Sequence, residues 1–301
     1  MEAGGSDVAN IIHGLEKIAE FAVLLGMDFR LLPVLLAKFG NPTSGIQIFV
    51  NTLLDARKSR AEKRSAPSRA AGDFCSKLDT LRGKNPESHK KYRGGNVLLA
   101  NVATGSDTTI TSPSAILFHL IRQRDSYLKL RREIIDAVER GEVDDPITLD
   151  QAQKLPYLQL AIKEGLRIHA ATGLPMWRVV PRGGATIADT YFPEGAVVGI
   201  NSWVAHHNQN VFGADAATFR PERWDPTTTP EQQLNRMERY FIPFGAGTRT
   251  YIGKNISTME ITKLIPELVK RYDFELCSEE LKYVNHWFVK PHDLNARITR
   301  V

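Results

Sequence analysis

The sequence predicts a mainly α-helical protein that carries small antiparallel β-sheets. Apolar residues recur at helical spacing over long stretches such as 8–25, 44–63 and 122–140. Between residues 177 and 200, and again near the C-terminus, short apolar runs are separated by turn residues, which is typical of short strands. A glycine-rich loop at 241–256 leads into a further run of helical spacing. These observations favour a helical fold with a few hairpins.

The first third of the chain predicts two long helices and a short one. Residues 8–25 have an amphipathic helical pattern, and Pro33 interrupts the apolar patch that follows. A second helix is expected at about 44–63, and its C-terminal end is basic, as the helix dipole prefers. Residues 64–90 are polar and contain glycines and prolines, so we expect a loop there, with a short helix near 74–81.

A long helix is expected at 92–121, and its middle contains residues that are unfavourable in a helix. Residues 104–109 place a glycine among hydroxyl and carboxyl side chains. Such side chains compete for backbone hydrogen bonds and weaken a helix. Taken alone, the segment predicts a bend or a junction between two helices.

The next two helices are expected at 122–140, where Gly141 supplies a C-cap, and at 156–169, where a proline occupies the first turn. The second of them carries Glu164 and Arg167, which are three residues apart and therefore share a face. A lone pair of this kind is usually an exposed ion pair of little energetic value.

Short strands are predicted in two regions beyond these helices. The first region is expected to form a small antiparallel sheet, and the second follows the last helix. The expected strands are 177–180, 185–188 and 196–200 in the first region, and 274–276, 287–289 and 296–299 in the second.

Composition narrows the class of protein. The chain has 301 residues, of which 42% are hydrophobic and 24% charged, with a formal net charge of +5. These values fit a soluble globular protein of one large domain or two smaller ones. The dense basic run at 57–69 lacks interleaved aromatic residues, so we interpret it as a solvated helix end and expect no nucleic-acid partner. Contact of this run with anionic lipid is a weaker alternative.

Two further features bear on membranes and metals. The most apolar region, 21–39, is interrupted by charged residues and a proline, so it predicts no unbroken membrane span. Cys75 and Cys277 are far apart and lack metal-type spacing. His206 and His207 look like a metal-binding pair, but we interpret them as residues at the end of a helix.

The glycine-rich loop is the strongest candidate for a ligand site. Gly245 and Gly247 allow the backbone to turn tightly and to approach a flat ligand that a Cβ would obstruct. The helical pattern that starts after Gly253 places free N–H groups at the end of the loop, where they favour an anionic ligand atom. A simple connector between elements is the alternative.

Two phosphate-binding patterns are excluded at this loop. A P-loop needs glycine at position 248 and serine or threonine at 255, whereas the sequence has Thr248 and Asn255. The dinucleotide fingerprint needs a glycine where Thr250 stands.

The loop resembles the haem-binding loop of the cytochrome P-450 monooxygenases, whose pattern is Phe-x-x-Gly-x-Arg-x-Cys-x-Gly. Phe244, Gly247, Arg249 and Gly253 match in register, and Tyr251 occupies the position of the cysteine. The resemblance implies that the four matching residues bind haem b. It also implies that residue 251 holds the position of the axial iron ligand.

The segment 104–109 resembles another motif of this family, which lies on the long central helix that binds dioxygen. Gly105, Asp107, Thr108 and Thr109 match it. The resemblance implies that Asp107 and Thr108 are catalytic and deliver protons during activation of dioxygen.

The remaining motifs follow in the order of the family. Glu164 and Arg167 match its Glu-x-x-Arg pair, which is a buried structural pair completed by an arginine from Phe219-Arg-Pro-Glu-Arg-Trp, here Arg223. Arg178 aligns with an arginine that contacts a haem propionate, and Arg249 with another. Guanidinium groups suit this task because they are permanently charged and can hold a carboxylate bidentately.

The chain therefore resembles fungal members of the pisatin-demethylase type over essentially its whole length. The resemblance implies a cytochrome P-450 fold over residues 1–301, corresponding to the C-terminal portion, with the N-terminal helices and membrane anchor missing. It implies oxidation, hydroxylation or O-demethylation of a small apolar molecule, using dioxygen and electrons from NADPH through an NADPH–cytochrome reductase. The family works at the cytosolic face of the endoplasmic reticulum membrane, and a chain without the anchor is expected in the cytoplasm.

Tyr251 opens a second hypothesis. In the family the cysteine thiolate donates electron density to iron and favours cleavage of dioxygen, whereas tyrosine ligates haem iron as a phenolate. Phenol has an ordinary pKa near 10, so ligation must itself drive ionisation. The alternative to an active monooxygenase is therefore a degenerate member in which turnover is lost.

Overall fold

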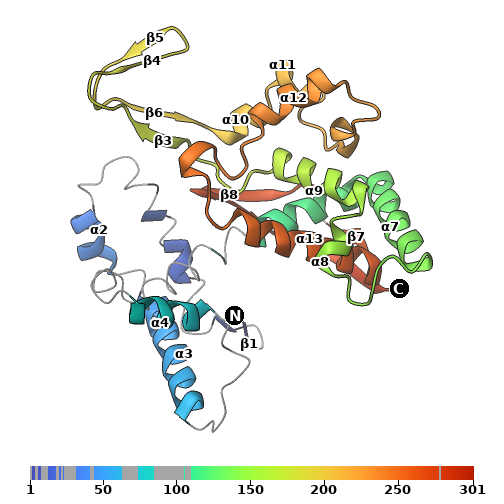
Figure 1. Cartoon of the computed structure of the whole chain (residues 1–301), viewed down its shortest axis with the longest axis horizontal. Coiled ribbons are helices and arrows are strands. Elements are labelled where there is room, and N and C mark those ends of the chain that lie inside the picture. Colours follow the sequence, from blue (N-terminus) through green and yellow to red (C-terminus); the bar gives the residue numbers. More distant parts are fainter. Residues whose placement is uncertain are drawn as a thin grey trace. The chain divides into compact units, whose positions relative to one another are not determined.

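The computed structural model describes residues 2–3, 6–7, 13–17, 20–21, 23, 32–40, 44–62, 74–84, 105, 110–277 and 279–301. The chain divides into two compact units, 1–107 and 108–301, which are described separately (Figure 1).

The longer helices among the described residues of the first unit are α2 (Leu32–Phe39), α3 (Ser44–Glu62) and α4 (Phe74–Lys84). The predictions of helices at 44–63 and 74–81 are confirmed. Of the helix predicted at 8–25, residues 13–17, 20, 21 and 23 are helical. Two strands of two residues each, β1 (Glu2–Ala3) and β2 (Ser6–Asp7), precede them and form an antiparallel pair.

Helix α2 was not predicted, because Pro33 was interpreted as an interruption of the apolar patch. In the structure Pro33 occupies the first turn of the helix. Proline is tolerated there because its missing N–H has no partner within the helix in any case.

Helices dominate the second unit. Residues 110–122 are helical. The elements that follow are α7 (Arg124–Glu139), α8 (Leu149–Ala152), α9 (Pro156–Ile168), α10 (Ser202–His206), α11 (Gln209–Phe212), the 3-10 turn η4 (Pro221–Trp224), α12 (Glu231–Tyr240), the 3-10 turn η5 (Gly247–Arg249) and α13 (Lys254–Arg271). The predictions of helices at 122–140, at 156–169 and after the glycine-rich loop are confirmed.

Helices α7, α9 and α13 pack against one another and enclose the main core (Figure 1). Leu130 of α7, Leu158 of α9 and Ile265 of α13 are fully buried in it. Burial of such side chains stabilises each helix–helix contact by about 1.5–3 kcal/mol per residue. Helix α9 is held in this core, so the side chains on its faces are fixed in position.

The strands of the second unit form antiparallel pairs at its periphery. The pairs are β3 (Met176–Val179) with β6 (Val197–Ile200), β4 (Ala185–Ile187) with β5 (Thr190–Phe192), β7 (Tyr272–Leu276) with β10 (Ala296–Arg300), and β8 (Lys282–His286) with β9 (Phe288–His292). The predicted fold class, mainly α with small antiparallel sheets, is confirmed.

Three details of the strand prediction were wrong. The region 177–200 forms two separate pairs rather than one sheet, and β5 was missed. It was missed because the turn before it uses Ala188 and Asp189, both with positive φ, instead of the glycine-containing turn that signals a hairpin. The strand predicted at 287–289 begins one residue too early, since Trp287, with φ +72°, forms the turn between β8 and β9.

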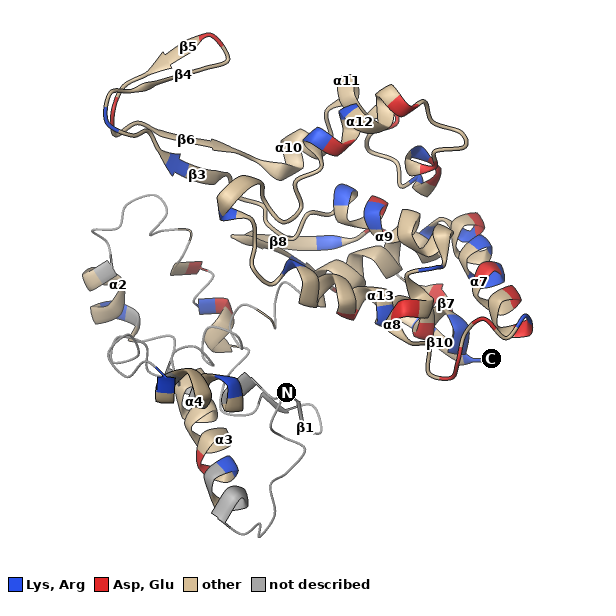
Figure 2. Cartoon of the chain, viewed as in Figure 1, with Lys and Arg blue, Asp and Glu red and all other residues tan. Residues whose placement is uncertain are grey.

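Two properties of the described residues concern the surface. Lys and Arg are interspersed with Asp and Glu along α7 and α12 (Figure 2). Among the described helices, none combines the length and the apolar character that crossing a bilayer requires.

Candidate functional site

The first part of the candidate site is the acid–base pair on α9. Glu164 and Arg167 lie one helical turn apart, and both side chains are 0% exposed. The guanidinium donates from Nε to Oε2 at 2.9 Å and from Nη2 to Oε1 at 2.8 Å. Two parallel charge-assisted bonds of this kind fix both side chains in one geometry. The pair belongs to the interior of the second unit.

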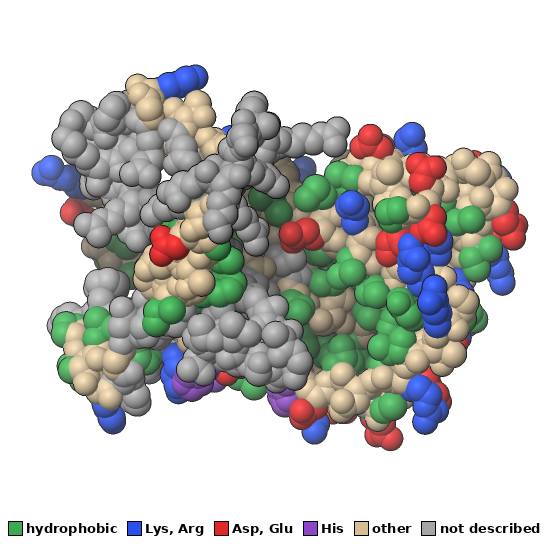
Figure 3. All heavy atoms as spheres, turned by 90° about the horizontal axis from the view of Figure 1, so that it is seen from below, with side chains coloured by type: hydrophobic (Ala, Val, Ile, Leu, Met, Phe, Trp, Pro, Cys, Tyr) green, Lys and Arg blue, Asp and Glu red, His purple; other side chains and the backbone are tan. Residues whose placement is uncertain are grey.

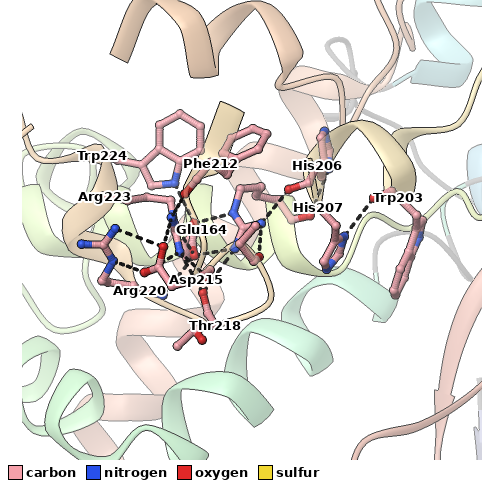
Figure 4. A network of polar contacts seen from close by, with 12 residues as sticks. Glu164, Trp203, His206, His207, Phe212, Asp215, Thr218, Arg220, Arg223 and Trp224 are labelled. Atoms are coloured by element: carbon pink, nitrogen blue, oxygen red, sulfur yellow. Dashed lines mark hydrogen bonds and ion pairs between the residues drawn. The ribbon is translucent and has the colours of Figure 1, made fainter. Parts of the chain in front are cut away.

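Arg223 joins this pair from the 3-10 turn η4. Its Nε donates to Oε1 of Glu164 at 2.9 Å, and the neighbouring indole of Trp224 donates to Oε2 at 2.9 Å. The backbone N–H of Arg220 adds a further bond to Oε1 at 3.0 Å. Figure 4 shows Glu164 at the centre of these groups. We name Glu164, Arg167 and Arg223 the charge network.

The other donors of the charge network reach backbone carbonyls and one carboxylate. Arg223 lies 3.3 Å from the carboxylate of Asp215, which also pairs with Arg220 at 2.7 Å. Burial acts to raise the pKa of Asp215, but the guanidiniums of Arg223 and Arg220 outweigh it and the pKa is lowered. The carbonyl acceptors are His206, Ala216 and Thr218 for Arg167, and Phe212, Asp215 and Thr218 for Arg223.

The charges of this cluster are all paired. Three guanidiniums, those of Arg167, Arg223 and Arg220, face two carboxylates, Glu164 and Asp215, and no buried side-chain donor or acceptor of the described residues lacks a partner. Buried charges are costly to desolvate unless they are paired and hydrogen-bonded in this way. The arrangement is therefore suited to holding several chain segments together.

His206 is a member of the site that the sequence analysis missed. It lies at the end of α10 and is 0% exposed. Its Nδ1 lies 3.0 Å from the carbonyl oxygen of Arg167, and the backbone N–H of Ile242 donates to its Nε2 at 2.9 Å. Burial lowers its pKa to about 3, so the ring is neutral. The pattern of two adjacent histidines gave no signal of this role.

The second part of the candidate site is the glycine-rich loop. Phe244 packs against the main core, and its carbonyl accepts a hydrogen bond from the N–H of Tyr251 at 2.9 Å. Gly245 and Gly247 have φ values of +76° and +67°, which residues with a Cβ atom rarely adopt. A Cβ at Gly245 would lie 3.2 Å from the sulfur of Met176, so the loop lies close to β3.

Tyr251 is partly buried just before α13. Its ring is stacked on Phe244, with centroids 6.5 Å apart and planes inclined by 12°. A Cβ at Gly253 would lie 2.6 Å from the phenol oxygen, so the phenol occupies space that the glycine leaves open. Among the described residues, none makes a hydrogen bond to this oxygen.

Arg178 on β3 and Arg249 within the loop place two cations at this site. Arg178 is exposed on β3 and donates to the carbonyl of Trp177 at 2.7 Å, and Arg249 is exposed in η5. Neither forms an ion pair with a carboxylate of the part of the chain that the structure describes. Both guanidiniums are available for the acidic groups of a ligand.

These features fit haem in all but the nature of one ligand atom. The loop and β3 together offer backbone without Cβ atoms, two guanidiniums that have no carboxylate partner among the described residues, and a phenol, which is an established haem-iron ligand. The thiolate is replaced. Asp107 and Thr108 lie outside the described residues. The described His, Cys, Asp and Glu side chains include no group of three or more that is placed to hold a metal ion.

Comparison with known proteins gives a consistent result. The family model for cytochrome P-450 matches residues 6–295. A pisatin demethylase of Fusarium vanettenii is 44% identical over 193 residues, which are 64% of this chain and 36% of the relative. Cytochrome P-450 monooxygenase cicH of Emericella nidulans is 35% identical over 232 residues, covering 75% of this chain and 45% of the relative.

A solved structure is also similar. The crystal structure of a cytochrome P-450 (CYP102L1) matches with a TM-score of 0.58 and 28% identity, over 68% of this chain and 45% of that protein. The chain thus spans less than half the length of the relatives that it matches.

Proposed function

Since the chain belongs to the cytochrome P-450 family, we propose that it descends from haem-dependent monooxygenases and that residues 244–253 form its haem site. The observation that carries this proposal is the loop itself. Phe244, Gly247, Arg249 and Gly253 stand in the register of the family's pattern, directly before the N-terminus of α13. The chain covers less than half of the length of these relatives. The activity of the whole protein is therefore part of our proposal.

The residues of the loop and of β3 take defined roles in it. Arg178 and Arg249 hold the propionates, because their guanidiniums are exposed and free of carboxylate partners among the described residues. Gly247 and Gly253 keep the backbone free of Cβ atoms, and Phe244 packs the loop onto the core. The charge network holds the segments before the loop in place.

Haem, when bound in this family, activates dioxygen so that one oxygen atom enters the substrate. Asp107 and Thr108 are proposed to deliver the protons, from the segment that resembles the family's oxygen-binding helix. Electrons come from NADPH through a reductase at the cytosolic face of the endoplasmic reticulum. We infer a small apolar substrate, as expected for a chain resembling the pisatin-demethylase type, and oxidation, hydroxylation or O-demethylation as its reaction.

Tyr251 supports a second candidate, a catalytically impaired member of the family. Its phenol stands where the family has a thiolate, and a phenolate is a harder and poorer electron donor. A phenol must lose its proton to ligate iron. We propose that Tyr251 would still hold the haem iron through its phenol oxygen, while turnover is lost.

The test is the absorption spectrum of the 301-residue chain titrated with haem, reduced and exposed to carbon monoxide. Tyr251→Cys is measured beside it, with Tyr191→Cys, an exposed position on β5, as the matched control. We expect a red-shifted band typical of thiolate ligation in Tyr251→Cys alone. Absence of haem uptake by all three proteins would contradict the haem site.

Turnover separates the two candidates. With a reductase, NADPH and an O-methylated aromatic substrate, we expect no sustained product from the wild-type chain. Product formation by the wild type at the rate of Tyr251→Cys would reject the impaired candidate and favour an active monooxygenase.

A further inference from the structure

His206 connects the charge network to the glycine-rich loop. Its carbonyl accepts a hydrogen bond from Nη1 of Arg167 at 2.7 Å, while its Nδ1 faces the carbonyl of Arg167 at 3.0 Å. The two residues therefore bind each other in both directions. Its other nitrogen, Nε2, receives the N–H of Ile242 at 2.9 Å. One side chain thus joins α9, α10 and the start of the loop.

The partners of the ring determine its tautomer. A carbonyl oxygen only accepts hydrogen bonds, so Nδ1 must carry the proton toward Arg167. A backbone N–H only donates, so Nε2 must be the unprotonated acceptor toward Ile242. Burial, which lowers the pKa of His206 to about 3, keeps the ring in this neutral form at physiological pH.

Aromatic contacts close a circuit around this ring. The imidazole stacks on Phe241, with centroids 5.7 Å apart and planes inclined by 25°. Phe241 meets Trp224 edge to face at 5.2 Å, and the indole N–H of Trp224 donates to Glu164. The path from Glu164 through Arg167, His206, Phe241 and Trp224 returns to Glu164. A displacement of His206 is therefore opposed from both sides.

The start of the loop is in turn connected to Tyr251. The carbonyl of Ile242 accepts from the N–H of Gly245 at 3.1 Å, and the carbonyl of Phe244 accepts from the N–H of Tyr251 at 2.9 Å. The ring of Phe244 also stacks on that of Tyr251. A shift of Ile242 can thus pass to Tyr251 through two backbone hydrogen bonds and one ring contact.

We propose that His206 is a positioning residue, which fixes Ile242 relative to the charge network and so sets where the loop presents Tyr251. The proposal deepens the haem-site proposal and rests on it for its functional meaning. Its structural content is independent of haem, because every contact in the path belongs to the chain itself.

The test uses two substitutions that each keep half of the ring's hydrogen bonds. The amide of asparagine reaches the place of Nδ1, so His206→Asn keeps a donor toward Arg167 and loses the acceptor for Ile242. The longer glutamine reaches the place of Nε2, so His206→Gln keeps the acceptor and loses the donor. Both variants remove the same aromatic ring and differ in which partner they retain.

The readouts come first from the haem-free 301-residue chain. We expect hydrogen exchange at the Ile242 amide to be about tenfold faster in His206→Asn than in His206→Gln, as for loss of one hydrogen bond. We also expect the nuclear Overhauser contact between the rings of Phe244 and Tyr251 to persist in His206→Gln and to vanish in His206→Asn. Equal exchange in the two variants, or an unchanged ring contact, would overturn the proposal. A role in stability alone would weaken both variants without separating them.

A measurement on the wild type keeps the proposal testable if both variants unfold. The hydrogen bond predicts a through-bond coupling between the amide nitrogen of Ile242 and Nε2 of His206, and its absence would overturn the proposal. Haem titration of the same proteins then tests the functional meaning. A changed haem spectrum in His206→Asn alone supports it, and identical spectra in all three proteins overturn the link to Tyr251. Failure of the wild type to take up haem, with the haem-free differences intact, counts against the haem site only.

Discussion

Among single residues, Glu164 is the one whose removal should cost most. Glu164→Ala leaves the buried guanidiniums of Arg167 and Arg223 without their shared carboxylate. Breaking a buried pair in this way typically destabilises a protein by about 3–5 kcal/mol. Urea unfolding of the 301-residue chain, followed by circular dichroism, measures the change.

The matched control is Glu142→Ala. Glu142 pairs with Arg140, and both side chains are more than half exposed. Exposed pairs contribute little because water screens them. Equal losses of stability in the two variants would contradict the importance of burial.

At the residue scale, the sequence indicated the pair better than its surroundings. The spacing of Glu164 and Arg167 was sufficient to place them on one helical face. Spacing alone favoured an exposed pair, and only the resemblance to a family implied burial. His206 was not predicted because its partners are backbone groups of Arg167 and Ile242, which leave no side-chain pattern.

Among the elements, α9 depends on a carboxylate from a neighbouring helix. Glu133 of α7 accepts hydrogen bonds from the N–H groups of Tyr157 at 2.7 Å and Leu158 at 3.0 Å, in the first turn of α9. These donors have no partner within their own helix. Burial raises the pKa of Glu133, although the two N–H groups oppose this rise.

We expect Glu133→Ala to destabilise the second unit by about 1–2 kcal/mol, as for loss of a helix cap. Glu133→Gln should cost less, because its amide oxygen still accepts one bond. Glu139→Ala, at the exposed end of α7, is the control. Thermal unfolding measures all three, and the idea is wrong if Glu133→Ala behaves like the control.

Prediction of the elements succeeded where the periodic pattern of apolar residues was long. The apolar spacing of α3, α9 and α13 extends over several turns, so it identifies a helix without knowledge of its neighbours. Strands β5 and β8 are short, and their positions follow from turns at Ala188 and Trp287 that use uncommon residues. Short hairpins are therefore defined by tertiary context more than by local pattern.

Considered as a whole, the molecule contains several histidines that fold in the neutral form. Burial lowers the pKa of His119 and His206 from 6.5 to about 3, and it also lowers the pKa values of His169 and His207. Below pH 6.5 these histidines bind protons in the unfolded chain but remain unprotonated in the folded chain. Stability is therefore fully present above about pH 6.5 and is lost as pH falls toward 3.

The expected size of this loss can be measured. Between pH 7.5 and pH 5, His206 alone should account for about 2 kcal/mol of lost unfolding free energy. His206→Gln should remove that part of the pH dependence, and His286→Gln, at an exposed strand position, should not. Urea titrations at the two pH values provide the data. A pH dependence unchanged in His206→Gln would show that folding does not lower the pKa of His206.

At the same scale, the family could be recognised from motifs in order, and the family model confirms it. The relation between the motifs was beyond the sequence. Residues 164 and 223 are far apart along the chain, as are 206 and 242, and each pair is joined by a hydrogen bond in the folded chain. Hydrophobic side chains also gather on the right-hand part of the view in Figure 3.

The contacts between guanidiniums and carbonyls have a consequence for how this sequence can change over generations. Every amino acid supplies a carbonyl, so replacing Ala216 or Thr218 leaves the acceptors of Arg167 and Arg223 in place. An insertion or deletion between residues 212 and 218 would instead move several acceptors at once. Selection is thus expected to preserve the length of this segment more strictly than its amino-acid sequence. The three side chains of the charge network are expected to remain unchanged.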